Sequence, residues 1–234
     1  MLLKIVTYKK YKNLMNINLK HASDLAGRIP RSIASSPFLT TLAISQSHIA
    51  DDDVKLILDN IGESPLLLHL DLSHNKITSK GARAITEMLV APSESILACL
   101  DISGNKISSE GASIMGQALA TNESLLSLTL RLNSIGDEGG KDLFEGLKQN
   151  ATLRHLNLSA NKLGSSSAMN LLKLLDEKAS PDCELDSIVL TSNEFAEEEV
   201  GCLSQCKVCY VDVRTSCDPA KNGNESLASE MPSK

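Results

Sequence analysis

Four cysteines near the C-terminal end of the chain have the clearest potential for metal chemistry. Cys202, Cys206, Cys209 and Cys217 fall within 16 positions, and zinc binds tetrahedral sets of four thiolates. Their spacing lacks the paired Cys-x2-Cys units of many zinc sites, because only Cys206 and Cys209 are separated by two residues. These two also fall in an apolar strand pattern, in which a cysteine packs as a small hydrophobic residue. We therefore predict no metal site, and the role of the cluster stays open.

A glycine-rich segment and two histidines are the next candidates for catalysis. Residues 136–141 read Gly-Asp-Glu-Gly-Gly-Lys, but Asp142 follows the lysine where a phosphate-binding loop needs Ser or Thr. His69 and His155 fall three repeats apart in the pattern described below, about 14 Å at roughly 4.8 Å per strand. That distance is too long for a shared metal ion or a catalytic dyad, and no Ser or Cys has a base in a recognisable arrangement. We predict no catalytic residue and no cofactor.

A repeated strand pattern organises the chain. The motif Leu-x-x-Leu-x-Leu-x-x-Asn-x-Ile, with aliphatic exchanges, recurs five times, and an earlier copy carries Ser47 in the asparagine slot. The asparagine slots are Asn75, Asn105, Asn133, Asn161 and Asn193. From Ser47 onward the intervals between slots are 28, 30, 28, 28 and 32 residues. Alternating leucines place apolar side chains on one face of a short strand, and the slot amide is expected to bond backbone groups where the strand turns away.

The second half of each repeat has a helical period. In the copy after Asn75, Gly81 and Ala82 lead to Ile85 and Leu89, and these steps of three and four mark a helix with one buried stripe. This alternation resembles the leucine-rich repeat of the ribonuclease-inhibitor subtype. The resemblance implies an α/β fold: a leucine-rich-repeat solenoid, or horseshoe, with a parallel concave sheet, outer helices, and about six full repeats plus degenerate caps.

Weaker patterns at both ends predict caps. Residues 1–38 read as an N-terminal cap and degenerate first repeat, in which Leu14, Ile17 and Leu19 fit the strand template. Residues 39–200 form the repeats, and residues 201–214 form a C-terminal cap strand with Cys206, Cys209 and Val211 in the template positions. Residues 215–234 lack an apolar period and are predicted to be disordered.

Polar residues at the outward strand positions predict a binding face. The candidate partner contacts on this concave surface are His69, Asp71, Asp101, Thr129, Arg131, His155 and Asn157. Small polar residues surround them, and a third outward position in successive strands is expected at Ser45, Ser73, Ser103, Arg131, Ser159 and Thr191. The alternative is that each of these residues is only a solvated strand position. A curved repeat surface without reactive groups is typical of protein binding.

Net charge, hydropathy and cysteine content limit the kinds of partner and compartment that we expect. The 234 residues carry a net charge of −6, which disfavours nucleic acid and anionic membranes as partners. No apolar run reaches the roughly 20 residues that span a membrane. The six cysteines show no disulfide framework, so we expect a reducing, cytoplasmic compartment, which includes the interior of a cilium. The expected partners are other proteins, with no small-molecule ligand.

Two stretches resemble one family more closely than the general repeat. They are Leu70-Asp-Leu-Ser-His-Asn-Lys-Ile77 with Gly81-Ala-Arg-Ala-Ile85, and Leu130-Arg-Leu-Asn-Ser-Ile-Gly-Asp-Glu-Gly-Gly140. They are similar to the leucine-rich-repeat subunits of the nexin–dynein regulatory complex, the T-complex-associated testis-expressed family. The resemblance implies a non-enzymatic scaffold of the axoneme in cilia and flagella that docks on coiled-coil subunits and helps to regulate dynein-driven motility. Members of that family are longer, so the chain is either a shortened homologue or another repeat protein.

Two other classes of repeat protein remain as alternatives. A GTPase-activating protein for the Ran GTPase uses the same repeat, but it needs a finger arginine near the N-terminal rim and usually ends in a strongly acidic run, which residues 222–230 do not provide. A general cytosolic adaptor or inhibitor that binds a globular ligand is the other alternative.

Overall fold

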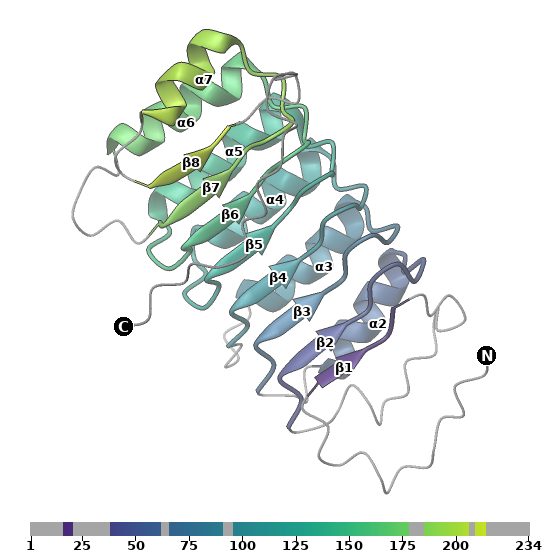
Figure 1. The fold of residues 1–234 in the computed structure, drawn as a ribbon. Coiled ribbons are helices and arrows are strands. Elements are labelled where there is room, and N and C mark those ends of the chain that lie inside the picture. Colours follow the sequence, from purple (N-terminus) through teal and green to yellow (C-terminus); the bar gives the residue numbers. More distant parts are fainter. Residues whose placement is uncertain are drawn as a thin grey trace, which may run out of the picture.

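Within the described residues, eight short strands form one parallel sheet in chain order, β1 to β8 (Figure 1). The computed structural model describes residues 16–20, 38–61, 66–90, 96–177, 185–205 and 209–213. The strands are β1 Asn16–Asn18, β2 Thr41–Ala43, β3 His69–Asp71, β4 Cys99–Asp101, β5 Ser127–Thr129, β6 His155–Asn157, β7 Ser187–Val189 and β8 Tyr210–Asp212. A parallel neighbour needs a crossover connection, and most of these connections contain a helix.

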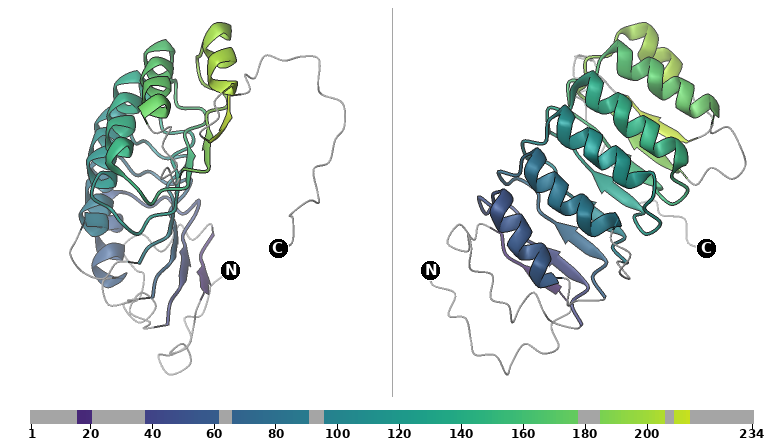
Figure 2. Two further views of the ribbon diagram at one scale, coloured as in Figure 1. Left: turned by 90° about the vertical axis from the view of Figure 1, so that its left-hand side faces the viewer. Right: turned by 180° about the vertical axis from the view of Figure 1, so that it is seen from behind.

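Helices cover one face of the sheet and leave the other open (Figure 2). In the described residues they are α2 Asp51–Ile61, α3 Ser79–Val90, α4 Ser109–Leu119, α5 Gly136–Gln149, α6 Ser165–Glu177 and α7 Glu197–Ser204. The strands curve along the inner side of the arc and the helices form its outer layer. The architecture is the predicted α/β leucine-rich-repeat solenoid.

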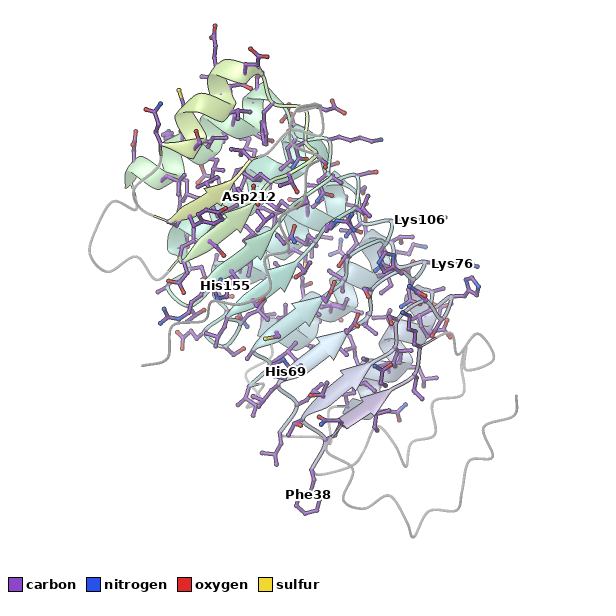
Figure 3. All side chains as sticks on the ribbon, in the orientation of Figure 1. Phe38, His69, Lys76, Lys106, His155 and Asp212 are labelled. Carbon is purple, nitrogen blue, oxygen red and sulfur yellow. The ribbon has the colours of Figure 1, made fainter. Side chains whose placement is uncertain are left out.

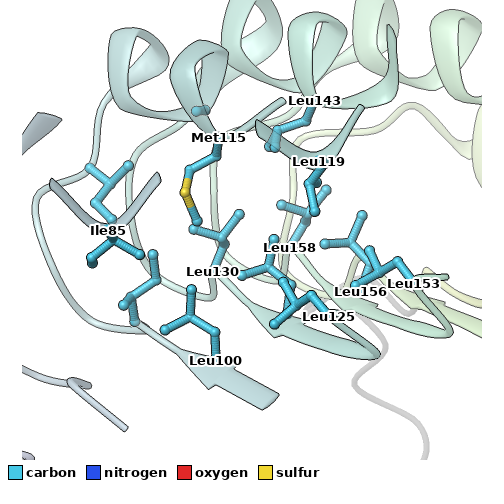
Figure 4. Close-up of a cluster of buried hydrophobic side chains, with 14 of the residues drawn as sticks. Ile85, Leu100, Met115, Leu119, Leu125, Leu130, Leu143, Leu153, Leu156 and Leu158 are labelled. Carbon is cyan, nitrogen blue, oxygen red and sulfur yellow. The ribbon is translucent and has the colours of Figure 1, made fainter. Parts of the chain in front are cut away.

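The core lies between these two layers. The middle residue of every strand is buried and pairs in register with its neighbours, for example Leu70 with Leu100 and Leu100 with Leu128. The helices add the residues that the helical period indicated, such as Ile85 and Leu143 (Figure 4). Leucines and isoleucines from adjacent repeats therefore share one continuous core, as expected for a stack in which no repeat buries its own apolar face.

The bends after strands β2 to β7 use left-handed backbone. His74, Leu132, Ser134, Ala160, Lys162 and Ser192 all have positive φ, and each lies immediately before or after an asparagine slot. Leu132, for example, has φ 58°. This conformation costs a residue other than glycine roughly 1–2 kcal/mol, so the slot side chains must hold the backbone in place.

Helices α4 and α5 pack backbone to backbone at two glycines. A Cβ on Gly146 would lie 1.9 Å from the carbonyl oxygen of Gly116, and a Cβ on Gly116 would lie 2.4 Å from that of Asp142. Glycine is required at both positions, since any side chain would force the helices apart.

The terminal predictions have mixed outcomes. β1 forms and pairs with β2, with Ile17 opposite Leu42, as the first-repeat template indicated. β8 also forms, but its predicted register is wrong by two residues: Val211, not Cys209, pairs with Ile188. Val213 then occupies the next buried position, because two β-branched valines fill the core better than a cysteine.

Several predictions lie outside the described residues. They concern residues 1–15, including Leu14, the disordered tail at 215–234, and Cys206 and Cys217 of the cysteine cluster. The boundaries proposed for the caps stay a prediction, and α7 crosses the boundary at residue 200. In the described part of the chain, no helix combines the length and apolar character needed to cross a membrane.

Candidate functional site

The open face of the sheet carries two rows of outward side chains that run across all eight strands. The first row is Asn16, Thr41, His69, Cys99, Ser127, His155, Ser187 and Tyr210. The second row is Asn18, Ala43, Asp71, Asp101, Thr129, Asn157, Val189 and Asp212. Figure 3 shows His69, His155 and Asp212 on this face. Six of the seven predicted contact residues belong to these rows.

Three side chains of the second row, Asp71, Asp101 and Asn157, each close a turn at the end of their own strand. Asp71 accepts a 2.8 Å hydrogen bond from the backbone N–H of Ser73. Asp101 accepts a 2.8 Å bond from the N–H of Ser103, and also one from its hydroxyl. Asn157 accepts equivalent bonds from Ser159, at 3.0 Å from the N–H and 2.8 Å from the hydroxyl. These bonds hold the side chains in fixed orientations.

A third row of outward residues was expected beyond the strands, and for most of them this expectation is wrong. Ser45, Ser73, Ser103 and Ser159 are all buried. The strands end before these positions, so the alternation of inward and outward side chains does not continue, and the serine side chains are buried. Arg131 is exposed, as expected, and Thr191 is half-buried.

The two histidines do not meet. His69 lies on β3 and His155 on β6, with β4 and β5 between them (Figure 3). The sequence did not indicate, however, that His155 Nδ1 would lie 2.9 Å from the hydroxyl of Ser187 on the next strand. Both residues are register partners on open sheet, and only the parallel pairing, not their spacing in sequence, brings them together.

A shallow hollow interrupts the face over β2 to β5. Its volume is about 180 Å³, and it is lined by Thr41, His69, Leu70, Asp71, Cys99, Leu100, Asp101, Ser127 and Thr129. Cys99 is half-buried, and burial raises the pKa of its thiol. Four predicted contacts, His69, Asp71, Asp101 and Thr129, therefore line one depression.

The asparagine slots support this face from beneath. The side chain of Asn133 donates to the carbonyls of Ile102 at 3.0 Å and Leu130 at 3.0 Å, and accepts from the N–H of Ile107 at 3.2 Å. Asn161 and Asn193 repeat this pattern, and Asn193 accepts from the N–H groups of both Asn161 and Leu163. The predicted backbone bonds are present, and they also join each repeat to the one before it.

A second asparagine ladder was not recognised in the sequence. Asn122 and Asn150 are buried just before β5 and β6. The amide of Asn150 donates to the carbonyls of Leu119 at 2.8 Å and Asn122 at 3.0 Å, and its oxygen accepts from the N–H of Leu153 at 2.7 Å. Their 28-residue spacing and shared Asn-x-Ser/Thr-Leu context were the signals available.

Two aspartates at helix starts bind the start of the following helix. Asp137 of α5 accepts bonds from the N–H groups of Gly164 at 2.8 Å and Ser167 at 3.0 Å at the start of α6. Asp51 of α2 does the same for Thr78 and Gly81 before and within α3. Burial on its own raises the pKa of Asp137, but the hydrogen bonds from Ser167 and Gly164 outweigh it, and the pKa is lowered.

The described residues do not gather a metal site. Among the residues that the structure describes, no three His, Cys, Asp or Glu side chains come together in a way that would hold a metal ion. Cys202 is exposed on α7, and Cys209 is half-buried before β8.

Comparison with known proteins identifies the repeats. Residues 63–85, 97–113, 121–144 and 149–172 match the family model described as leucine-rich repeat. A comparison with curated protein sequences gave no match.

Solved structures with a similar fold include actin-binding site 2 of leiomodin-1, at 20% identity and a TM-score of 0.50 over 61% of this chain and 82% of that one. The C-terminal domain of tropomodulin from Caenorhabditis elegans is similar at 12% identity and a TM-score of 0.49, over 71% of this chain and 84% of that one. An internalin from Listeria monocytogenes is similar at 19% identity and a TM-score of 0.47, over 83% and 57%. The family match identifies leucine-rich repeats within residues 63–172, and the fold of the described residues is an α/β solenoid of the leucine-rich-repeat type.

Proposed function

We propose that this chain is a non-enzymatic scaffold that binds a protein partner on the concave face of its sheet. The observation that carries the proposal is the pair of polar rows across eight strands, left uncovered while the helices occupy the opposite face. The asparagine ladders join the backbone of successive repeats, so the face is held in shape before a partner arrives. A preformed surface lowers the entropic cost of binding.

The geometry favours binding over catalysis. The thiol of Cys99 stays protonated because burial raises its pKa, and the thiolate is the nucleophilic form of cysteine. The contact between His155 and Ser187 lies on open sheet with both residues accessible to water. Enzymes that use such pairs enclose the reacting groups and exclude water.

The resemblance to the nexin–dynein regulatory complex supports a finer proposal. In this proposal the chain is a structural and regulatory component of the ciliary axoneme, and its partner is a coiled-coil subunit. One of the two stretches that carry the resemblance, residues 130–140, forms the bend after β5 and the start of α5. Within it, Arg131 is exposed at the concave face, and Asp137 caps the next helix.

Site-specific cross-linking tests which surface is used. A photoreactive residue replaces Thr129 on the concave face or, as a matched control, Met169, which is 70% exposed on the outer helix α6. We expect a discrete cross-linked product in extracts of ciliated cells from the Thr129 position but not from Met169. A product only from Met169 would refute the use of the concave face.

Localisation tests the finer proposal separately. A tagged full chain expressed in ciliated cells should stay with the axoneme after detergent extraction of the membrane. A chain that is lost to the soluble fraction, while the Thr129 cross-link persists, would end the axonemal proposal and leave the scaffold proposal standing. Co-sedimentation with filamentous actin is a useful parallel assay, since actin-binding site 2 of leiomodin-1 has a similar fold.

A further inference from the structure

The hollow over β2 to β5 combines a neutral floor with two carboxylates. Leu70 and Leu100 contribute only backbone to it, because their side chains are buried in the core on the helix side of the sheet. Cys99 contributes a thiol that is kept neutral because burial raises its pKa, and Asp71 and Asp101 also line the hollow. Among the side chains that line the hollow, these two carboxylates are therefore the only source of negative charge.

The two carboxylates are direct neighbours across the sheet. Asp71 pairs in register with Asp101, and like charges at directly opposed positions of a sheet are destabilising. The flanking positions of the same row, Ala43 and Thr129, are neutral. The turn bonds from Ser73 and Ser103 hold both carboxylates in place, so they cannot easily rotate apart.

A metal ion does not suit this arrangement. Calcium takes about six to eight oxygen ligands, and the described residues contain no cluster of three metal-ligating side chains. A guanidinium or ammonium group needs fewer partners, because each donates several hydrogen bonds and carries the compensating charge on a long apolar stem.

We propose that this hollow receives an arginine or lysine side chain of the protein partner, with its charge between Asp71 and Asp101. The inference rests on the proposed use of the concave face and names the chemistry of the anchor residue. It also fixes how the partner is oriented along the face, since the basic residue of the partner would lie over the strands of the N-terminal half.

Another strand of the chain shows that asparagine can replace an aspartate of this row and keep its hydrogen bonds, so that only the charge is removed. Asn157 occupies the same row on β6 and makes the same two bonds to Ser159 that Asp101 makes to Ser103. The double variant Asp71→Asn/Asp101→Asn is therefore expected to keep both turns and the fold. Glu87→Gln/Glu123→Gln removes the same net charge from exposed positions outside the concave sheet and is the matched control.

Selection from a random library of short peptides displayed on phage tests the proposal with the full chain as bait. Peptides that bind wild-type protein are expected to contain a basic residue whose replacement by Gln abolishes binding. The Asp71→Asn/Asp101→Asn variant should bind the same peptides at least about tenfold more weakly, the effect of losing one charge-assisted hydrogen bond. The control variant should bind them as wild-type does.

A double-mutant cycle makes the result specific. Replacing the basic anchor of the peptide should have no further effect on the double variant, because the two changes remove the same interaction. Equal binding by wild-type and the double variant, or additive effects in the cycle, would overturn the proposal. If Tyr210→Glu on the same face abolished peptide binding while the double variant did not, the peptides would bind the concave face without a basic anchor. If only Met169→Glu abolished peptide binding, the use of the concave face would be refuted as well.

Discussion

Replacing Asn133 by Leu tests whether the asparagine ladder holds the repeats together. Asn133 is 1% exposed and lies in the middle of the array. Leucine has a similar size, so the substitution removes the amide without opening a large cavity. The variant should be less stable because the backbone groups that the amide satisfies lose a partner.

The structure sets the size of this effect. The carbonyl of Ile102 keeps a donor in the side chain of Asn105 at 2.9 Å, and that of Leu130 keeps one in Asn161 at 2.9 Å. The buried N–H of Ile107, in contrast, is bonded to Asn133. Leaving one buried donor unsatisfied costs about 1–3 kcal/mol, so we expect a loss of roughly 2 kcal/mol in the free energy of unfolding.

Chemical denaturation followed by circular dichroism measures this loss, and thermal unfolding should show a Tm lower by about 4–8 °C, given roughly 2–4 °C per kcal/mol for a chain of this size. The transition should stay single, because neighbouring repeats share one core. Asn170→Leu is the control, since the amide of Asn170 bonds only within its own helix, to the carbonyl of Ser166 at 2.9 Å. Equal effects of the two variants, or an unfolding curve that splits in two, would refute the reasoning.

Three further substitutions test other parts of the structure. Gly146→Ala should destabilise the chain by about 1–3 kcal/mol, because its Cβ would lie 1.9 Å from the Gly116 carbonyl oxygen; Gly201→Ala, with no atom within 4 Å of its Cβ, should instead leave stability unchanged or improve it slightly in denaturant titrations. Leu132→Gly should stabilise the chain by about 1 kcal/mol, because Leu132 is exposed and has φ 58°; a loss of stability would show that its side chain packs. Asp137→Asn should destabilise the wild-type fold at neutral pH by about 0.5–2 kcal/mol, as for loss of a helix cap. Folding lowers the pKa of Asp137, so its contribution is present above the ordinary value of 3.8 and is lost as the pH falls below it; stability curves of the two proteins that stay parallel into acid would contradict this.

The repeat could be predicted from the sequence because its signals are local. The alternation around Leu70 and the three-to-four spacing of Gly81, Ile85 and Leu89 each describe one element, and both elements form as expected. The slots at Asn75 to Asn193 also follow from spacing alone. The outward positions of the candidate face, such as Asp101, follow from the same alternation wherever a strand is present.

Other features depend on contacts between repeats, which no local pattern encodes. The register of β8 was decided by which side chains fill the core against Ile188, and the burial of Ser103 by the short length of β4. The second ladder through Asn150 and the contact of Gly116 with Gly146 join residues about 30 positions apart. The sequence alone determined the order and periodicity of the elements, because these express short-range sterics and amphipathicity. Only the tertiary structure decided how successive repeats are joined and where the face is hollowed, because both depend on the distance at which one repeat packs against the next.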